Sequence, residues 1–129
     1  MTVEYVAVLI AAYPAIREVW LIGSRADNTA SPSSDWDYLA FADRFTFDDL
    51  ARRDGDLNDP AIDLLLVYDD DQFCKPWPDG ERQKKGSLSG WEWRKQSDTH
   101  ATYRATKPRG GDDFNVQVTT GTATRVYPA

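Results

Sequence analysis

The chain has 129 residues, of which 41% are hydrophobic, and it carries a formal net charge of −6. This length corresponds to one domain with enough apolar residues for a folded core. An acidic chain binds nucleic acid poorly, because phosphate contacts supply most of that affinity. No apolar run approaches the roughly 18 residues of a membrane span, and the N-terminus lacks the pattern of a secretory signal. Because Cys74 is the single cysteine, we expect no internal disulfide and a cytoplasmic protein with neither a membrane nor a nucleic-acid polymer as its partner.

The first half of the chain has the pattern of alternating helices and strands. Apolar residues recur at helical spacing before Pro14, and three later runs are rich in β-forming residues. Thr46 and Asp49 have capping-box spacing, which predicts that Thr46 is the N-cap of a two-turn helix. The elements expected here are helices over 2–13 and 47–53 and strands over 18–22, 36–42 and 61–68.

The second half has the pattern of a β-meander. Strands are expected over 91–94, 99–106, 114–119 and 122–127, with hairpin turns at 110–112 and at Thr120-Gly121. Charge also changes along the chain, because residues 35–71 hold twelve acids and three bases whereas residues 72–129 hold six acids and ten bases. We therefore expect an α/β (α+β) fold in which helices pack on one face of a mixed sheet. A single domain, 1–129, would comprise a core, 1–71, and a β-rich extension, 72–129, which either continues the sheet or folds over its edge.

Three acids are the first candidate site residues. Asp35 and Asp37 open the second expected strand with one residue between them, so they project to the same face. Asp63 interrupts the apolar third strand, where a carboxylate has no packing role. Adjacent carboxylates repel each other unless a cation lies between them, and Mg²⁺ prefers such oxygen ligands. If the three acids meet, they can hold two Mg²⁺ ions of the kind that stabilise displacement at phosphorus.

The turn after the first strand is the second candidate. Gly23 and Ser24 follow an apolar run, and a turn of this kind presents backbone N–H groups to phosphate oxygens. Arg25 comes next and carries a guanidinium fork that matches a phosphate group. A phosphate cradle beside a metal cage indicates chemistry on a nucleoside triphosphate.

These motifs together resemble the signature of the DNA polymerase β-like nucleotidyltransferase superfamily, and the small minimal nucleotidyltransferases most of all. The similarity covers about half of the chain, residues 14–68. It is carried by Gly23-Ser24-Arg25-Ala26, Thr29-Ala30, Pro32, Ser34-Asp35-Trp36-Asp37-Tyr38-Leu39 and Asp63.

The resemblance implies an enzyme with the nucleotidyltransferase fold, and it assigns a role to each motif. Gly23 and Ser24 would contact the triphosphate, and the three acids would ligate the two Mg²⁺ ions. Asp63 could also help to deprotonate the acceptor hydroxyl. The reaction would move a nucleoside monophosphate, with ATP as the expected donor, to a hydroxyl of a protein or of a small molecule. Minimal members often act as antitoxins that modify a toxin chain, so a toxin is the leading protein partner.

Alternatives accompany these hypotheses. Asp27 and Asn28 stand where the family commonly has a basic residue and a glycine, which supports a non-catalytic binding module of the same fold that acts through a protein partner. Three aromatic residues of the second half could form a base-stacking surface, but we favour a packing role for them: Trp91, Trp93 and Tyr103. His100 is expected to be an ordinary strand residue rather than a base for Ser24.

Overall fold

A computed structural model describes residues 2–27, 35–53, 57–77, 85–108 and 116–128. Its elements in chain order are α1 (Thr2–Ala12), β1 (Glu18–Ile22), α2 (Ser24–Asp27), β2 (Trp36–Phe41), α3 (Arg44–Arg52), β3 (Ile62–Tyr68), β4 (Gln72–Cys74), β5 (Lys85–Ser87), β6 (Arg94–Lys95), β7 (His100–Pro108) and β8 (Val116–Tyr127). The first helix and the first three strands lie where the sequence predicts them, to within one residue at each end. In the described part of the chain, no helix is both long enough and apolar enough to span a membrane.

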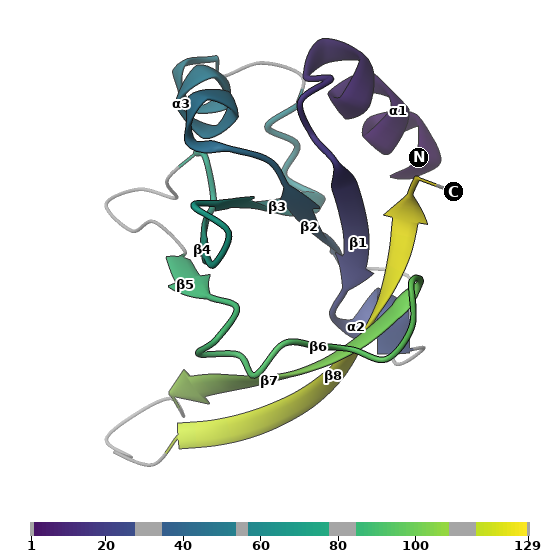
Figure 1. Ribbon diagram of the computed structural model, residues 1–129, viewed down its shortest axis with the longest axis vertical. Coiled ribbons are helices and arrows are strands. Elements are labelled where there is room, and N and C mark those ends of the chain that lie inside the picture. Colours follow the sequence, from purple (N-terminus) through teal and green to yellow (C-terminus); the bar gives the residue numbers. More distant parts are fainter. Residues whose placement is uncertain (1, 28–34, 54–56, 78–84, 109–115, 129) are drawn as a thin grey trace.

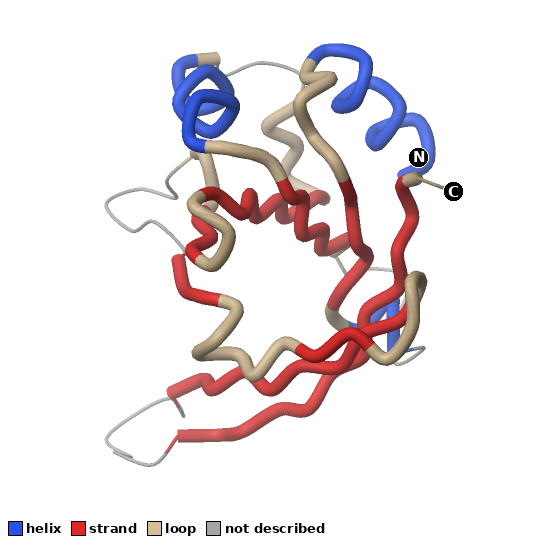
Figure 2. Tube along the Cα trace, viewed as in Figure 1, coloured by secondary structure: helices blue, strands red, loops and turns tan. Residues whose placement is uncertain are grey.

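The strands form one mixed sheet of eight strands in the order β5-β4-β3-β2-β1-β8-β7-β6. Strands β2 and β3 are parallel, and β1 pairs antiparallel with β2. The α+β class and the mixed sheet are therefore confirmed. The later strands extend the sheet at both edges, and β8 joins the two halves because it pairs with β7 along its first part and with β1 near its end. Figures 1 and 2 show that the sheet curls strongly, so that its two edges approach each other.

One face of the sheet carries a cluster that includes helix residues. Strand residues alternate between faces, and those facing this side are Val19, Tyr38, Ala40, Leu64 and Leu66. They share the cluster with Tyr5, Val6 and Leu9 of α1 and with Phe47 and Leu50 of α3. Figure 1 shows both helices at the same end of the molecule. We call this set the helix-side cluster.

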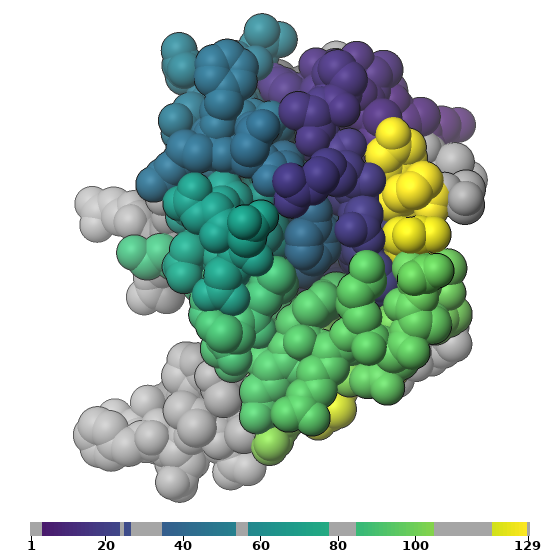
Figure 3. All heavy atoms as spheres, in the orientation of Figure 1, coloured from purple at the N-terminus to yellow at the C-terminus, as the bar shows by residue number. Residues whose placement is uncertain are grey.

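The opposite face lines the inside of the curl and carries a second cluster. Its buried members are Trp20, Ile22, Leu39, Leu65, Val67, Phe73, Ala101, Tyr103 and Ala123, with Phe41, Leu88, Trp91 and Trp93 packed against them. Figure 3 shows atoms across the space that the ribbon encloses. We call this set the inner cluster. It confirms the packing role expected for Trp91, Trp93 and Tyr103, whose rings stack on one another with centroid distances of 5.1 and 6.2 Å to Tyr103.

Two predictions for the second half are wrong. Thr120 and Gly121 do not form a hairpin turn, because β8 runs through them as one strand of 12 residues. Gly121 pairs with Tyr103, and a side chain at Gly121 would collide with the Tyr103 ring. The glycine therefore makes room for a neighbouring aromatic residue. The strand expected over 91–94 is also wrong, because residues 91–92 form a turn and the strand β6 begins only at Arg94. The expected turn at 110–112 lies outside the described residues.

The predicted N-cap of the third helix is wrong as well. The helix α3 begins at Arg44, and its N-cap is Asp43, whose carboxylate accepts a hydrogen bond of 2.8 Å from the Thr46 N–H. Thr46 itself is buried within the first turn. Asp43 and Thr46 have the same spacing as Thr46 and Asp49, and aspartate is as good an N-cap as threonine. The earlier start places Thr46 inside the helix, where its side chain is buried rather than free to act as the cap.

Candidate functional site

The structure brings Asp37 and Asp63 together. Asp37 is the second residue of β2, and Asp63 is the second residue of β3. The two strands are parallel and these residues are direct partners in the register, so their side chains lie side by side on one face. That face is the inner one, because Leu39 and Leu65 follow them at spacing two within the inner cluster. Both side chains are only partly exposed. Two half-buried carboxylates therefore meet at one end of the sheet.

Gly23 completes this end of the sheet. Ile22 pairs with Asp37, so Gly23 follows directly beside the carboxylate. A Cβ atom at Gly23 would collide with the Asp37 side chain, and the residue has a φ of +76°. Both observations require glycine. Because glycine has no side chain, the Asp37 carboxylate can lie directly against the turn.

The N–H group of Gly23 has a partner from the second half of the chain. It donates a hydrogen bond of 2.9 Å to the hydroxyl oxygen of Tyr103. The Tyr103 ring is buried and lies over Gly121. The N–H that was expected to face a phosphate is therefore held by a tyrosine, and β7 is coupled to the turn between β1 and α2. Sequence reasoning placed Tyr103 in the core and missed this contact.

The other residues of the motif differ in their surroundings from the pair of carboxylates. Asp35 is exposed and precedes β2 by one residue. Arg25 lies in the one-turn helix α2, and its guanidinium carbon is 4.3 Å from the centroid of the Trp36 ring. Trp36 packs against the helix-side cluster, so this cation–π contact directs Arg25 away from the inner face. Ser24 opens α2, and its side chain lies outside the described part of the structure, as do Asn28 and the side chain of Asp27.

A lysine that sequence reasoning missed contacts one of the carboxylates. Lys75 follows β4, and its Nζ atom is 3.4 Å from Oδ1 of Asp63. The two side chains are 22% and 20% exposed. A signal for this contact was present in the sequence, because Lys75 stands between Phe73-Cys74 and Pro76-Trp77. A charge within an apolar run is the same signal that singled out Asp63.

The side chains at this site provide some of the oxygen ligands that a divalent ion needs, together with one group that repels such an ion. The carboxylates of Asp37 and Asp63 are adjacent and supply the hard oxygen ligands that Mg²⁺ prefers. Lys75 already faces one of them. Within the described ranges, no group of three histidine, cysteine, aspartate or glutamate residues is arranged to hold a metal ion. A divalent ion would therefore meet carboxylate oxygens at Asp37, whereas the ammonium group of Lys75 lies beside Asp63.

Other reactive residues have ordinary surroundings. Cys74 is buried, and burial raises the pKa of its thiol, which keeps it protonated and unreactive. His100 is exposed, and its Nδ1 atom lies 2.9 Å from the Thr99 hydroxyl. His100 is the first residue of β7, which agrees with the strand position expected from the sequence.

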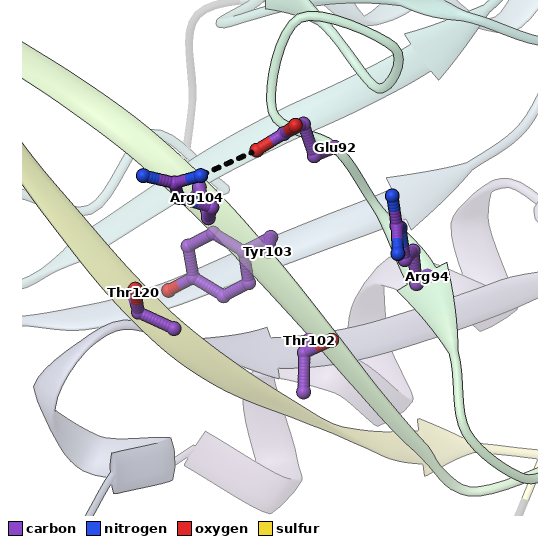
Figure 4. Close-up of a pocket in the computed structure, with 6 residues that line it drawn as sticks. All are labelled: Glu92, Arg94, Thr102, Tyr103, Arg104 and Thr120. Carbon is purple, nitrogen blue, oxygen red and sulfur yellow. Dashed lines mark ion pairs between the residues drawn. The ribbon is translucent and has the colours of Figure 1, made fainter.

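A separate pocket of about 230 Å³ lies on the second half of the chain (Figure 4). It is lined by Glu92, Arg94, Thr102, Tyr103, Arg104 and Thr120. Thr102 and Arg104 alternate with the buried Ala101 and Tyr103, so the pocket opens on the outer side of β7. Arg104 is paired with Glu92 at 3.3 Å. The lining contains neither Asp37 nor Asp63, and it shares with the candidate site only Tyr103, whose hydroxyl contacts Gly23.

Comparison with known proteins adds no further constraint: no protein-family model, curated protein or solved structure matches the chain.

Proposed function

We propose that this protein is a Mg²⁺-dependent nucleotidyltransferase, which transfers a nucleoside monophosphate from a nucleoside triphosphate to a hydroxyl group. The observation that carries the proposal is the register of β2 and β3, in which Asp37 and Asp63 are direct partners. Gly23 lies against Asp37 on the neighbouring strand. The sequence motif and the strand pairing thus converge on the same end of the same face.

The order of the elements also supports the proposal. In the nucleotidyltransferase fold that we propose for residues 1–71, helices pack on one face of the sheet and the acids lie on the other. The members of the helix-side cluster agree with this arrangement, because α1, α3 and alternate residues of β2 and β3 share it. Residues 72–129 are then an extension whose strand β8 pairs with β1.

The roles of the residues follow from their positions. Bound Mg²⁺ would supply charge stabilisation at the phosphoryl oxygens. Asp37, with Asp35 two residues before it, would hold the ion, and Gly23, which has no side chain, allows the Asp37 carboxylate to lie against the turn. The acceptor oxygen bonds to the α-phosphorus as the bond from that phosphorus to the bridging oxygen breaks. Pyrophosphate leaves with the electron pair, and the hydroxyl proton passes to Asp63.

The acceptor is a hydroxyl of a protein, with a toxin chain as the leading candidate, or of a small molecule. ATP is the expected donor. A nucleic-acid acceptor is disfavoured by the net charge of −6, because a polymer substrate requires many cationic contacts to phosphate.

Nucleotide-dependent thermal stability tests the proposal. We expect Mg²⁺ with at least one of ATP, GTP, CTP or UTP to raise the melting temperature of the wild type, since a ligand at 100 times its Kd stabilises by about 2.7 kcal/mol. Chelation with EDTA and the double variant Asp35→Asn/Asp37→Asn should each abolish the shift.

The matched control is Asp69→Asn/Asp70→Asn, which removes the same charge from the turn after β3. These acids are exposed, and both have positive φ angles that asparagine tolerates. They lie about 20 Å along β3 from Asp63, at 3.3 Å per residue. This variant should keep the full shift. A wild type that shows no metal-dependent shift with any of the four nucleotides sinks the enzyme hypothesis and favours the non-catalytic binding module.

A further inference from the structure

The contact between Lys75 and Asp63 belongs to the proposed site by its position. Cys74 pairs with Leu66, so the chain after β4 runs back along β3 toward the start of that strand. Lys75 is next in this direction and shares the inner face with Asp63, which its Nζ atom approaches to 3.4 Å. The ammonium group therefore reaches the end of the sheet at which the two carboxylates meet.

This ion pair is more shielded than the pairs on the surface. Its two side chains are 22% and 20% exposed, whereas those of Arg17 and Asp70 are 58% and 94% exposed. Charges removed from solvent interact more strongly and are screened less by salt. The ammonium charge opposes the repulsion between Asp63 and the adjacent Asp37, as a bound cation would.

The pairing does not fit the expected second metal ion. A site with two ions needs carboxylate ligands for both, and Asp63 is the ligand that the motif offers on β3. Its Oδ1 atom already faces a positive charge that the protein itself provides. A divalent ion at the same position would be repelled by the ammonium group, because like charges at such short range repel strongly where water is partly excluded.

We propose that the ammonium group of Lys75 takes the place of one of the two Mg²⁺ ions, so that the site binds a single divalent ion on its Asp37 side. This inference rests on the proposed function. Lys75 then acts as a fixed cation that orients Asp63 and faces the phosphates of the nucleotide. The site needs fewer free metal ions, and its second positive charge cannot dissociate.

Counting bound Mn²⁺ in place of Mg²⁺ tests this inference without measuring turnover. Equilibrium dialysis of the full chain with Mn²⁺ and a non-hydrolysable analogue of whichever of the four nucleotides raises the melting temperature most should give one bound ion per wild-type chain. Lys75→Met should bind two, because Asp63 becomes available as a ligand, and Lys75→Arg should still bind one. The matched control is Lys95→Met, which removes a lysine paired with Glu18 at 3.7 Å on a different strand. It should also bind one.

The outcomes separate the two proposals. Two ions bound to the wild type overturn the role of Lys75 and leave the enzyme hypothesis standing. One ion bound to both the wild type and a folded Lys75→Met chain also overturns it. No ion bound to the wild type overturns the proposed function and the inference together. The wild-type count is decisive even if Lys75→Met does not fold, which circular dichroism will show.

Discussion

The two faces of the sheet are built from the same strands and differ in what they hold. The helix-side cluster contains aliphatic residues and tyrosines from β2 and β3 together with α1 and α3. The inner cluster contains large aromatic residues and has an ion pair at either side, Lys75–Asp63 and Lys95–Glu18. Alternation along a strand sends neighbouring residues to opposite faces. The same strands therefore present different residues to the two faces.

The difference has a structural cause. Residues of α1 and α3 share the helix-side cluster, so a charge among these buried residues would be removed from water. The inner face is covered by the curl of the sheet, in which Trp91 packs on Phe73 with a centroid distance of 4.6 Å. This cover stops short of Asp37 and Asp63, which remain partly exposed. Charged residues are tolerated at that end because solvent, or a ligand, can reach them.

The neighbouring residues Leu64 and Leu65 give the sharpest test of this comparison. Each is 1% exposed, and they point to the helix-side and inner clusters respectively. Leu64→Ala and Leu65→Ala should each lower the free energy of unfolding by about 2–5 kcal/mol, measured by urea denaturation. Only Leu65→Ala, two residues from Asp63 on the same face, should also weaken the stabilisation by nucleotide. A loss below about 1 kcal/mol for Leu65→Ala would show that the inner face is not a packed core.

Gly121 tests whether the inner cluster supports the site through Tyr103. Gly121→Ala forces the Tyr103 ring to move, and overpacking of this kind costs about 1–3 kcal/mol. Because the Tyr103 hydroxyl also accepts the Gly23 N–H, the nucleotide-dependent shift in melting temperature should fall.

The control for this prediction is Gly90→Ala, whose new Cβ atom meets the movable hydroxyl of Ser87 at 2.9 Å and the Ser87 carbonyl oxygen at an ordinary contact distance of 3.6 Å. Its effect should stay within about 0.5 kcal/mol, as for other surface substitutions. Equal losses of stability in Gly121→Ala and Gly90→Ala would contradict the role given to the Tyr103 ring.

Asp43 gives the smallest expected effect and concerns the helix-covered face. Hydrogen bonds from the Thr46 side chain and backbone hold the pKa of Asp43 below its ordinary value. A lowered pKa in the folded state means that the stabilisation is fully present above the ordinary value of about 4 and is lost as the pH falls through the folded value. Asp43→Ala should therefore cost about 1 kcal/mol at neutral pH, and the difference from wild type should shrink in acid.

Asp43→Asn is the matched variant, because asparagine is an equally good N-cap that does not titrate. It should retain most of the stability in urea denaturation, with little dependence on pH. An Asp43→Ala deficit that stays constant between neutral pH and pH 3 would argue against the carboxylate as the source of the effect.

Local patterns were enough to predict the elements of the first half. Helical periodicity before Pro14 and dense β-forming runs identify α1, β1, β2 and β3, because each signal lies within a few residues. The alternation of Asp37 with Trp36 and Tyr38 correctly separates the two faces. The short strands β4 and β5 were missed, since three residues carry too little periodicity to distinguish a strand from a loop.

Local sequence patterns were also not enough to predict one turn and one helix cap. Thr120-Gly121 has the composition of a turn, but the Tyr103 ring 18 positions earlier needs the space above Gly121. Thr46 has the spacing of a cap, but the helix has Asp43 as its N-cap, which is at least as good a cap, and buries Thr46 within its first turn. Only in the first case does a contact distant in sequence outweigh a local preference.

The sequence by itself determined the acids of the candidate site and the strands that carry them, because a charge in an apolar run and a period of two are local properties. Only the tertiary structure decided that Asp37 and Asp63 are partners, that Tyr103 holds Gly23 and that Lys75 reaches Asp63. Strand order and register depend on the packing of the whole sheet, and no short segment encodes them.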